Sequence, residues 1–361
     1  MSSPTSMTVG LALFWGALGA SYVGVAAVRR YSLRRGVLDV PSDRSSHQVP
    51  TPRGGGLAVV VAVLTMGAAG VIRAGVPGAA VATAGAALLA VATVGWVDDH
   101  RPLGVGQRLV VHVLAGLAVA GLAHVWLGSG SAGWAIGLAL ATWWVFWTIS
   151  AINVVNFMDG IDGLIGSQLA IYAGYIATVA PAGSWARPLA LTVCGASLGF
   201  LRWNWAPAAI FLGDVGSGSF GLIAVLLGLG AIAPATAFAQ ERSIGDAAWQ
   251  LARASLPLAP LFLDAGVTIA RRARAGERLT TPHRSHLYQR LANGPLGHAR
   301  TAAIYAAAAV TAAAVGCAPA GGARMTVVAV YGVALFVVAR RLDALAGEPR
   351  GEPSATARGP V

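Results

Sequence analysis

Long apolar runs dominate this chain and limit what it can fold into. A helix that crosses a lipid bilayer needs about 20 mostly apolar residues, and the 361 residues contain eleven stretches of this kind. Pro257 and Pro260 interrupt the ninth stretch, so we expect that helix to be kinked or broken. The sequence therefore predicts an all-α polytopic membrane protein with about eleven transmembrane helices, near residues 9–28, 55–72, 78–96, 109–127, 133–152, 163–180, 187–203, 218–236, 249–270, 299–317 and 325–339.

The composition excludes several other classes of protein. Hydrophobic residues make up 56% of the chain and charged residues 11%, whereas about 25% of the residues are charged in typical soluble domains. A soluble nucleotide-binding enzyme and a disordered protein are therefore excluded. Cys194 and Cys317 both lie within apolar stretches, which argues against a disulfide framework or a thiolate metal site.

The basic residues indicate the orientation in the membrane. The chain has no lysine, and 20 of its 25 arginines follow odd-numbered apolar stretches or lie in the C-terminal tail. We expect the protein in the cell membrane, that is, the inner or plasma membrane. Because cytoplasmic segments are rich in basic residues, the N-terminus should lie on the outer side of this membrane and the C-terminus in the cytoplasm. The membrane domain then covers residues 1–341, and residues 342–361 form a disordered tail. This orientation also accounts for the net charge of +11, so no nucleic-acid partner is expected.

Aspartates from three separate segments are predicted to lie together at the cytoplasmic side. Asp98 and Asp99 follow the third apolar stretch, Asp159 and Asp162 lie between the fifth and sixth, and Asp214 lies between the seventh and eighth. Charges at a membrane boundary are costly unless they are paired or bound to metal, so these residues are candidates for function. Their hard oxygen ligands suit Mg²⁺. The alternative is that each aspartate caps a helix or pairs with a loop arginine.

Residues 153–163 carry polar side chains three positions apart. Successive members of such a series are neighbours on a helix, but four of them drift around its axis and cannot share one face. Gly160 and Gly163 allow the backbone to open, so that the four side chains could surround a small polar ligand. A simple turn is the alternative reading for the series, which consists of Asn153, Asn156, Asp159 and Asp162.

Other segments carry groups suited to phosphate. Residues 211–221 form a glycine-rich turn before an apolar stretch, where backbone N–H groups can hold phosphate oxygens. The basic segment 280–290 fits diphosphate binding better than zinc binding, because no cysteine or HExxH pattern accompanies its histidines. A patch for anionic lipid headgroups is the alternative. The basic candidates are His283, Arg284 and His286 in this segment and Arg44, His47 and Arg53 in the first loop.

Five motifs together support a resemblance to a known family. They are DVPSDRSSHQVPTPRGGG (39–56), DDHRPLGVGQRL (98–109), NVVNFMDGIDGL (153–164), FLGDVGSGSFG (211–221) and TPHRSHLYQRL (281–291). With these five motifs in this order, the chain resembles the polyprenyl-phosphate N-acetylhexosamine-1-phosphate transferases of glycosyltransferase family 4. The resemblance extends from about residue 36 to 340. That family includes enzymes that initiate common-antigen, teichoic-acid and O-antigen synthesis, and the phospho-MurNAc-pentapeptide transferase of peptidoglycan synthesis.

The resemblance implies a reaction. A UDP-N-acetylhexosamine and undecaprenyl phosphate would give undecaprenyl-diphosphate-sugar and UMP, with Mg²⁺ as cofactor and Mn²⁺ as a substitute. A phosphate monoester has a second pKa of about 6 and is largely a dianion at neutral pH. The lipid phosphate can therefore attack with little base assistance, and the protein must supply alignment and neutralisation of negative charge. The sequence leaves open whether an aspartate forms a covalent phospho-intermediate.

The resemblance also implies residue roles. Asp98, Asp99 and Asp214 would be catalytic, one of the first two acting on the lipid phosphate. Asp214 and Asp159 would hold the metal. The remaining candidates would bind the substrates: Asn153, Asn156, Asp159, Asp162, His283, Arg284, His286, Arg44, His47 and Arg53.

The wording of two motifs favours one subgroup and leaves rivals open. The segments RSSH (44–47) and HRSHLYQR (283–290) look most like the O-antigen-initiating enzymes, which use UDP-N-acetylglucosamine or 6-deoxy N-acetylhexosamines such as N-acetylfucosamine and N-acetylquinovosamine. A phospho-MurNAc-pentapeptide transferase is the enzymatic alternative. An ion-coupled transporter is a remote one, because transporter sites lie near the bilayer midplane, whereas these acids gather at one end. A homodimer is the expected assembly if the protein is not monomeric.

Overall fold

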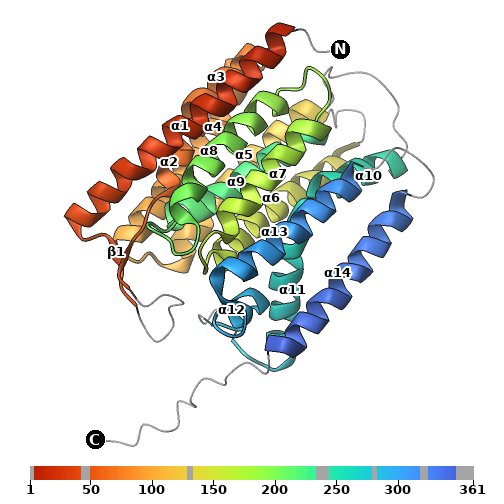
Figure 1. Ribbon diagram of the computed structural model, residues 1–361. Coiled ribbons are helices and arrows are strands. Elements are labelled where there is room, and N and C mark those ends of the chain that lie inside the picture. Colours follow the sequence, from red (N-terminus) through yellow and green to blue (C-terminus); the bar gives the residue numbers. More distant parts are fainter. Residues whose placement is uncertain are drawn as a thin grey trace, which may run out of the picture.

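The computed structural model describes residues 4–41, 49–127, 133–232, 244–278, 283–317 and 324–346. These residues form a bundle of helices with one small two-stranded sheet (Figure 1). In chain order the elements are α1 (Pro4–Arg35), β1 (Leu38–Asp39), β2 (Thr51–Pro52), α2 (Gly56–Ala62), the π-helical turn η1 (Val63–Gly67), α3 (Ala68–Arg73), α4 (Gly78–His100), α5 (Val105–Leu127), α6 (Gly133–Met158), α7 (Leu164–Val179), α8 (Ala186–Asn204), α9 (Asp214–Ile232), α10 (Ile244–Ser255), the 3₁₀ turn η3 (Leu256–Leu258), α11 (Ala259–Arg274), α12 (Leu287–Ala292), α13 (Gly297–Gly316) and α14 (Arg324–Ala346).

Each of the eleven predicted apolar stretches contains helix. Within the described residues, seven helices are long and apolar enough to cross a membrane. They are α1, the continuous helix Gly56–Arg73, α4, α5, α6, α9 and α13. The prediction of an all-α polytopic membrane protein is therefore confirmed. The short helix α12 was not predicted.

The ninth stretch is broken where the prolines lie. Helix α10 ends at Ser255, a 3₁₀ turn covers Leu256–Leu258, and α11 begins at Ala259. Proline lacks a backbone N–H, and its ring clashes with the preceding helical turn. The predicted interruption is thus confirmed.

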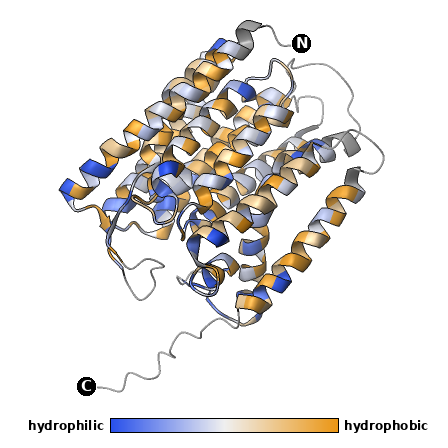
Figure 2. Cartoon of the chain, in the orientation of Figure 1, coloured by the Kyte–Doolittle hydropathy of each residue, from blue (hydrophilic) through white to orange (hydrophobic). Residues whose placement is uncertain are grey.

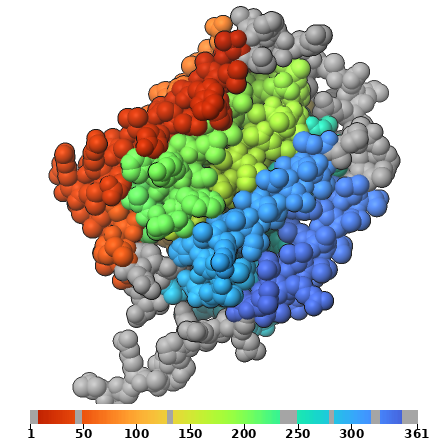
Figure 3. Space-filling model, viewed as in Figure 1, coloured from red at the N-terminus to blue at the C-terminus, as the bar shows by residue number. Residues whose placement is uncertain are grey.

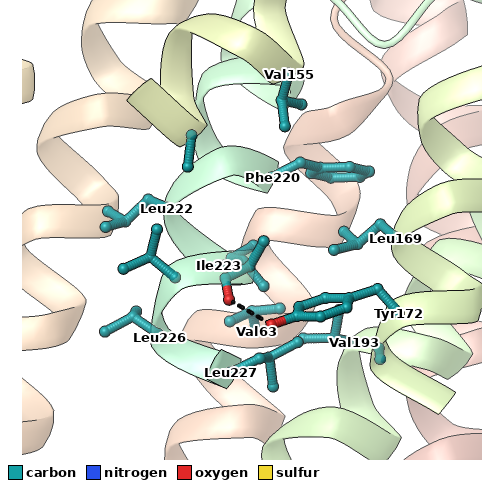
Figure 4. Close-up of a cluster of buried hydrophobic side chains, with 14 of the residues drawn as sticks. Val63, Val155, Leu169, Tyr172, Val193, Phe220, Leu222, Ile223, Leu226 and Leu227 are labelled. Carbon is teal, nitrogen blue, oxygen red and sulfur yellow. Dashed lines mark hydrogen bonds between the residues drawn. The ribbon is translucent and has the colours of Figure 1, made fainter. Parts of the chain in front are cut away.

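Helix α9 forms the centre of the bundle. It packs against α2, α4, α6, α7, α8 and α10, and nearly all of its residues are buried. Figure 4 shows its side chains among those of the surrounding helices, with the hydroxyl of Tyr172 donating a hydrogen bond to the carbonyl of Ala224 at 3.2 Å. Because α9 is enclosed by its neighbours, Asp214 at its first position is held in a fixed place.

Helices far apart in the chain lie side by side on the surface. The long helix α1 packs against α8, and α7 packs against α13 (Figure 3). The first, middle and last parts of the chain therefore form one bundle.

Polar groups gather at the end of the bundle where α1 ends. Figure 2 shows hydrophilic residues at the end of α1, beside β1 and around α12. The antiparallel pair β1–β2, in which Asp39 lies opposite Thr51, brings the first motif to this end. Arg44 and His47 lie in residues 42–48, outside the described residues.

Candidate active site

A polar cavity of about 230 Å³ opens at this end of the bundle. Parts of the chain from β1 to α13 contribute to it, and carboxylates predominate among its charged groups. The lining consists of Asp39, Arg53, Asp99, Asp159, Gly160, Ile161, Asp162, Asn204, Phe211, Leu212, Gly213, Asp214, Gln289 and His298. The predicted meeting of aspartates from separate segments is therefore observed.

Asp99, near the end of α4, holds the first turn of α9. Its Oδ1 accepts a hydrogen bond from the backbone N–H of Asp214 at 3.0 Å, and its Oδ2 accepts one from Val215 at 3.1 Å. A carboxylate at a helix N-terminus satisfies free N–H groups and interacts favourably with the helix dipole. The capping alternative thus applies to Asp99, although the cap comes from another helix. The nearby Nε of Arg53, 3.9 Å from Oδ1, offsets its charge.

Two glycines make this contact possible. Gly213 has a φ of +76°, and a Cβ there would lie 2.6 Å from Oδ2 of Asp99. A Cβ on Gly95 of α4 would lie 2.3 Å from the carbonyl oxygen of Asp214. Only glycine fits both the backbone conformation and the close approach. The structure therefore requires glycine at position 213, before the aspartate in FLGDVGSGSFG.

Arg108 joins two of the acidic residues. Its Nη1 lies 3.0 Å from Oδ2 of Asp98 and 3.8 Å from Oδ2 of Asp214. Asp98 also accepts a hydrogen bond from the backbone N–H of Leu103, and its side chain is largely buried. Arg108 was not predicted as a site residue, although it lies in the motif DDHRPLGVGQRL. Its position ten residues after Asp98, within the first turn of α5, was the available signal.

Asp214 itself faces the cavity. Its side chain is 38% exposed, whereas that of Asp99 is 2% exposed. The amide of Asn156, near the end of α6, donates to Oδ1 of Asp214 at 3.0 Å and lies 2.9 Å from the hydroxyl of Ser217. Asn156 thus orients Asp214, whose side chain stays partly exposed to the cavity.

Asp159 is the least compensated carboxylate of the cavity. It follows the end of α6, and in the described part of the chain its carboxylate takes part in no hydrogen bond or ion pair. Burial and the negative charges of Asp214, Asp99 and Asp162 raise the pKa of Asp159 well above its ordinary value. The cavity therefore holds an excess of negative charge.

The donor set fits a hard divalent cation. Mg²⁺ takes one or two protein carboxylates and completes its shell with water and substrate phosphate. Asp159 and Asp214 have the carboxylate oxygens least engaged by protein donors. Over the described ranges, no three His, Cys, Asp or Glu side chains form a ready cage for a metal. This arrangement suits an ion held partly by its substrate better than a closed structural site.

Asp162 is fixed from two sides. Its Oδ2 accepts a hydrogen bond from the backbone N–H of Ala208 at 3.0 Å, and its Oδ1 lies 3.4 Å from Nδ1 of His298. The next residue, Gly163, donates its N–H to Oδ1 of Asn204 at 3.0 Å. The loop between α6 and α7 is therefore connected to α8 and α13. His298, Asn204 and Gln289 line the cavity but were not predicted from the sequence. His298 and Asn204 lie outside the motifs, and Gln289 lies in the basic segment 280–290 but is uncharged.

Asn153 lies apart from the other members of its series. Its amide donates to the carbonyl of Ile149 at 2.8 Å and lies 3.5 Å from Nδ1 of His112. It is not among the lining residues of the cavity. Asn153 and Asn156 are on helix α6, whereas Asp159 and Asp162 follow its end, so the four residues do not share one helix.

The histidine-rich segment surrounds the start of α12. His286 is buried with its Nδ1 3.6 Å from Oδ1 of Asp264, and Asp264 accepts hydrogen bonds from the N–H groups of Leu287 and Tyr288 at 2.9 and 3.0 Å. Asp264, unexplained by the sequence, thus caps α12. His283, Arg284 and His286 are outside the lining of the cavity, and their role towards diphosphate stays a prediction. Burial, followed by the charges of His286 and Arg272, lowers the pKa of His283 to about 4.

The described residues thus form a multi-span bundle with an acidic cavity at one end. Residues 79–231 match the family described as glycosyl transferase family 4. The chain is 30% identical over 317 residues to the decaprenyl-phosphate N-acetylglucosaminephosphotransferase of Mycolicibacterium smegmatis, covering 79% of this chain and 75% of that one. The chain belongs to glycosyl transferase family 4.

Two other relatives define the range of similarity. The probable undecaprenyl-phosphate N-acetylglucosaminyl 1-phosphate transferase of Bacillus subtilis is 28% identical over 285 residues, which cover 75% of this chain and 74% of that protein. The phospho-N-acetylmuramoyl-pentapeptide-transferase of Moorella thermoacetica is 32% identical over 149 residues, which cover 36% of this chain and 46% of that one. The similarity to the N-acetylglucosamine enzymes thus extends over much more of the chain.

Proposed function

We propose that this protein transfers an N-acetylhexosamine-1-phosphate from a UDP-sugar to undecaprenyl phosphate, giving undecaprenyl-diphosphate-sugar and UMP. The observation that carries the proposal is the meeting of Asp99, Asp159, Asp162 and Asp214 around one cavity, with Asp98 beside it. The names of the relatives that match most of the chain support it, because they specify a polyprenyl phosphate and N-acetylglucosamine.

The charge of the cavity supports Mg²⁺ as the cofactor, with Mn²⁺ as a substitute. A diphosphate and a lipid phosphate both carry negative charge. Among the described residues of the lining they would meet five aspartates and two basic groups, Arg53 and His298. Asp159 and Asp214 would hold the ion. When bound, Mg²⁺ neutralises charge on the phosphate oxygens and makes the phosphorus more electrophilic.

The remaining groups would align the reactants. An oxygen of the lipid phosphate attacks the β-phosphorus of the UDP-sugar, and the bond from this phosphorus to the oxygen shared with the α-phosphate breaks, so that UMP leaves. The bond between the sugar C1 and its oxygen survives, and the anomeric configuration is retained. Asp98, held by Arg108, would orient the lipid phosphate. Asp99 and Asn156 would set the position of Asp214.

The site would face the cytoplasm at the inner or plasma membrane. The arginines at the end of α1 and the end of α11 lie at or near the same end of the bundle as the cavity. Basic residues favour the cytoplasmic side. The wording of the motifs RSSH and HRSHLYQR supports N-acetylglucosamine or a 6-deoxy N-acetylhexosamine as the sugar, and the first step of an O-antigen-type glycan as the pathway.

The test is a substrate panel with purified protein. Undecaprenyl phosphate and Mg²⁺ are combined with UDP-N-acetylglucosamine, UDP-N-acetylgalactosamine, a 6-deoxy UDP-N-acetylhexosamine or UDP-MurNAc-pentapeptide. We expect UMP release and a lipid product of the mass of undecaprenyl-diphosphate-N-acetylhexosamine. Turnover of the pentapeptide substrate alone would instead establish the rival function, which the partial similarity to the Moorella enzyme motivates.

A further inference from the structure

His298 links the C-terminal helices to the acidic loop of the cavity. It is the second residue of α13, and its imidazole is part of the cavity wall. Its Nδ1 lies 3.4 Å from Oδ1 of Asp162 and 3.5 Å from the backbone nitrogen of Asp162. A ring protonated at Nδ1 can donate to the carboxylate, and an unprotonated Nδ1 can accept from the backbone N–H. In either state the ring stays directed at Asp162.

The loop that receives this contact carries the uncompensated Asp159. Residues Asp159, Gly160, Ile161 and Asp162 all line the cavity between α6 and α7. The backbone N–H of Ala208 holds one oxygen of Asp162, so that His298 faces the other. Without the imidazole, Asp162 would keep one fixed oxygen and could rotate about it.

A second contact from the same part of the chain reaches the loop at another point. The hydroxyl of Tyr288 on α12 donates to the carbonyl of Phe157 at 2.9 Å. A Cβ on Gly160 would lie 2.3 Å from that hydroxyl, which shows how closely α12 approaches the loop. Tyr288 therefore fixes the last turn of α6, whereas His298 acts on the Asp162 carboxylate.

We infer that His298 is a positioning residue that holds Asp162, and with it the loop carrying Asp159, in the arrangement that binds the nucleotide sugar. The inference rests on the proposed function. It assigns His298 no contact with the lipid phosphate, because its polar contact is with Asp162. Loss of the imidazole should therefore weaken binding of the UDP-sugar much more than binding of the lipid.

Three single variants test this role. His298→Ala removes the contact. His298→Asn keeps an amide close to the position of Nδ1. Arg300→Ala removes an exposed side chain two residues along α13 and serves as the matched control. For each protein, kcat and KM are measured separately for the UDP-sugar and for undecaprenyl phosphate, together with the melting temperature in detergent.

We expect His298→Ala to raise KM for the UDP-sugar about tenfold or more, as for loss of a hydrogen bond to a charged group. KM for undecaprenyl phosphate should change less than about twofold, the Asn variant should recover most of the loss, and Arg300→Ala should match the wild type. In an Asp162→Ala background, His298→Ala should have little further effect. This non-additivity is the readout that a merely structural role in α13 would not produce.

The outcomes separate the inference from the proposed function. If the wild type turns over no UDP-N-acetylhexosamine, the proposed function fails. If the wild type is active and His298→Ala keeps its KM for the UDP-sugar, the positioning role is overturned. It is also overturned if His298→Ala and His298→Asn lose kcat and melting temperature together with KM unchanged, or if the losses from His298 and Asp162 simply add.

Discussion

The carboxylate of Asp99 accepts the backbone N–H of Asp214 at 3.0 Å, so one acidic residue of the cavity sets the position of another. Asp99 is buried and Asp214 is accessible. The two residues therefore have different roles. Asp99 anchors the first turn of the central helix α9, and Asp214 presents a carboxylate to the cavity. This division leads to different expectations for the same substitution at the two positions.

Asp99→Asn should lower both stability and activity, whereas Asp214→Asn should lower activity alone. An asparagine amide can accept only one of the two N–H groups that Asp99 satisfies, and loss of a cap costs about 1 kcal/mol. Replacement of Asp214 removes negative charge from a repulsive cluster, so stability without metal should hold or rise. Both variants should lose turnover by orders of magnitude. Melting temperatures and UMP release test this, and equal melting temperatures for Asp99→Asn and wild type would contradict the anchoring role.

Removal of divalent cations should abolish turnover and lower the melting temperature of the wild type. Mg²⁺ that binds the folded cavity stabilises it by mass action. Asp159→Asn and Asp214→Asn should each require at least about tenfold more Mg²⁺ for half-maximal stabilisation, since each removes one ligand. Melting is measured across a MgCl₂ series after EDTA treatment, with Asp343→Asn, at the end of α14 away from the cavity lining, as the control. Unchanged Mg²⁺ dependence in both cavity variants would exclude them as ligands.

The sequence predicted the architecture because its signals are local. Apolar length and the prolines at 257 and 260 suffice for the helices and for the break before α11. The aspartates that flank apolar stretches were found for the same reason, since a charge at a membrane boundary stands out against its neighbours. Asp159 and Asp214, selected as metal ligands, are in one cavity.

The contacts that position the site depend on packing between distant segments and were not predicted. Asp264 caps a helix that begins 23 residues later, and His298 contacts an aspartate 136 residues before it. Neither pairing has a sequence spacing that could reveal it. The histidine spacing in residues 283–286 indicated a ligand site, but in the structure His286 packs beside Asp264. A pattern of polar residues identifies chemistry, whereas the partner of each residue depends on the fold.

Asp264→Ala should destabilise the protein strongly. Asp264 accepts hydrogen bonds from Leu287, from Tyr288 and from the hydroxyl of Tyr305 at 2.6 Å, and the donors of Tyr288 and Tyr305 would remain buried without it. Removal of one partner from a buried charged network costs about 3–5 kcal/mol. Thr268→Val, which removes a weaker 3.3 Å contact, is the matched control. A melting temperature for Asp264→Ala equal to that of Thr268→Val would contradict a capping role.

His283 should make the folded protein sensitive to mild acid. Burial lowers the pKa of this imidazole from 6.5 to about 4 in the folded protein, so between these values the unfolded chain binds a proton that the folded chain does not. Titration of His283 therefore leaves the free energy of unfolding unchanged above about pH 6.5. It lowers this free energy increasingly as the pH falls towards 4. His283→Gln removes this titration and keeps a polar side chain. We expect the melting temperature to fall less between pH 7.5 and pH 5 in His283→Gln than in the wild type, and parallel curves for the two proteins would exclude His283 as a source of acid sensitivity.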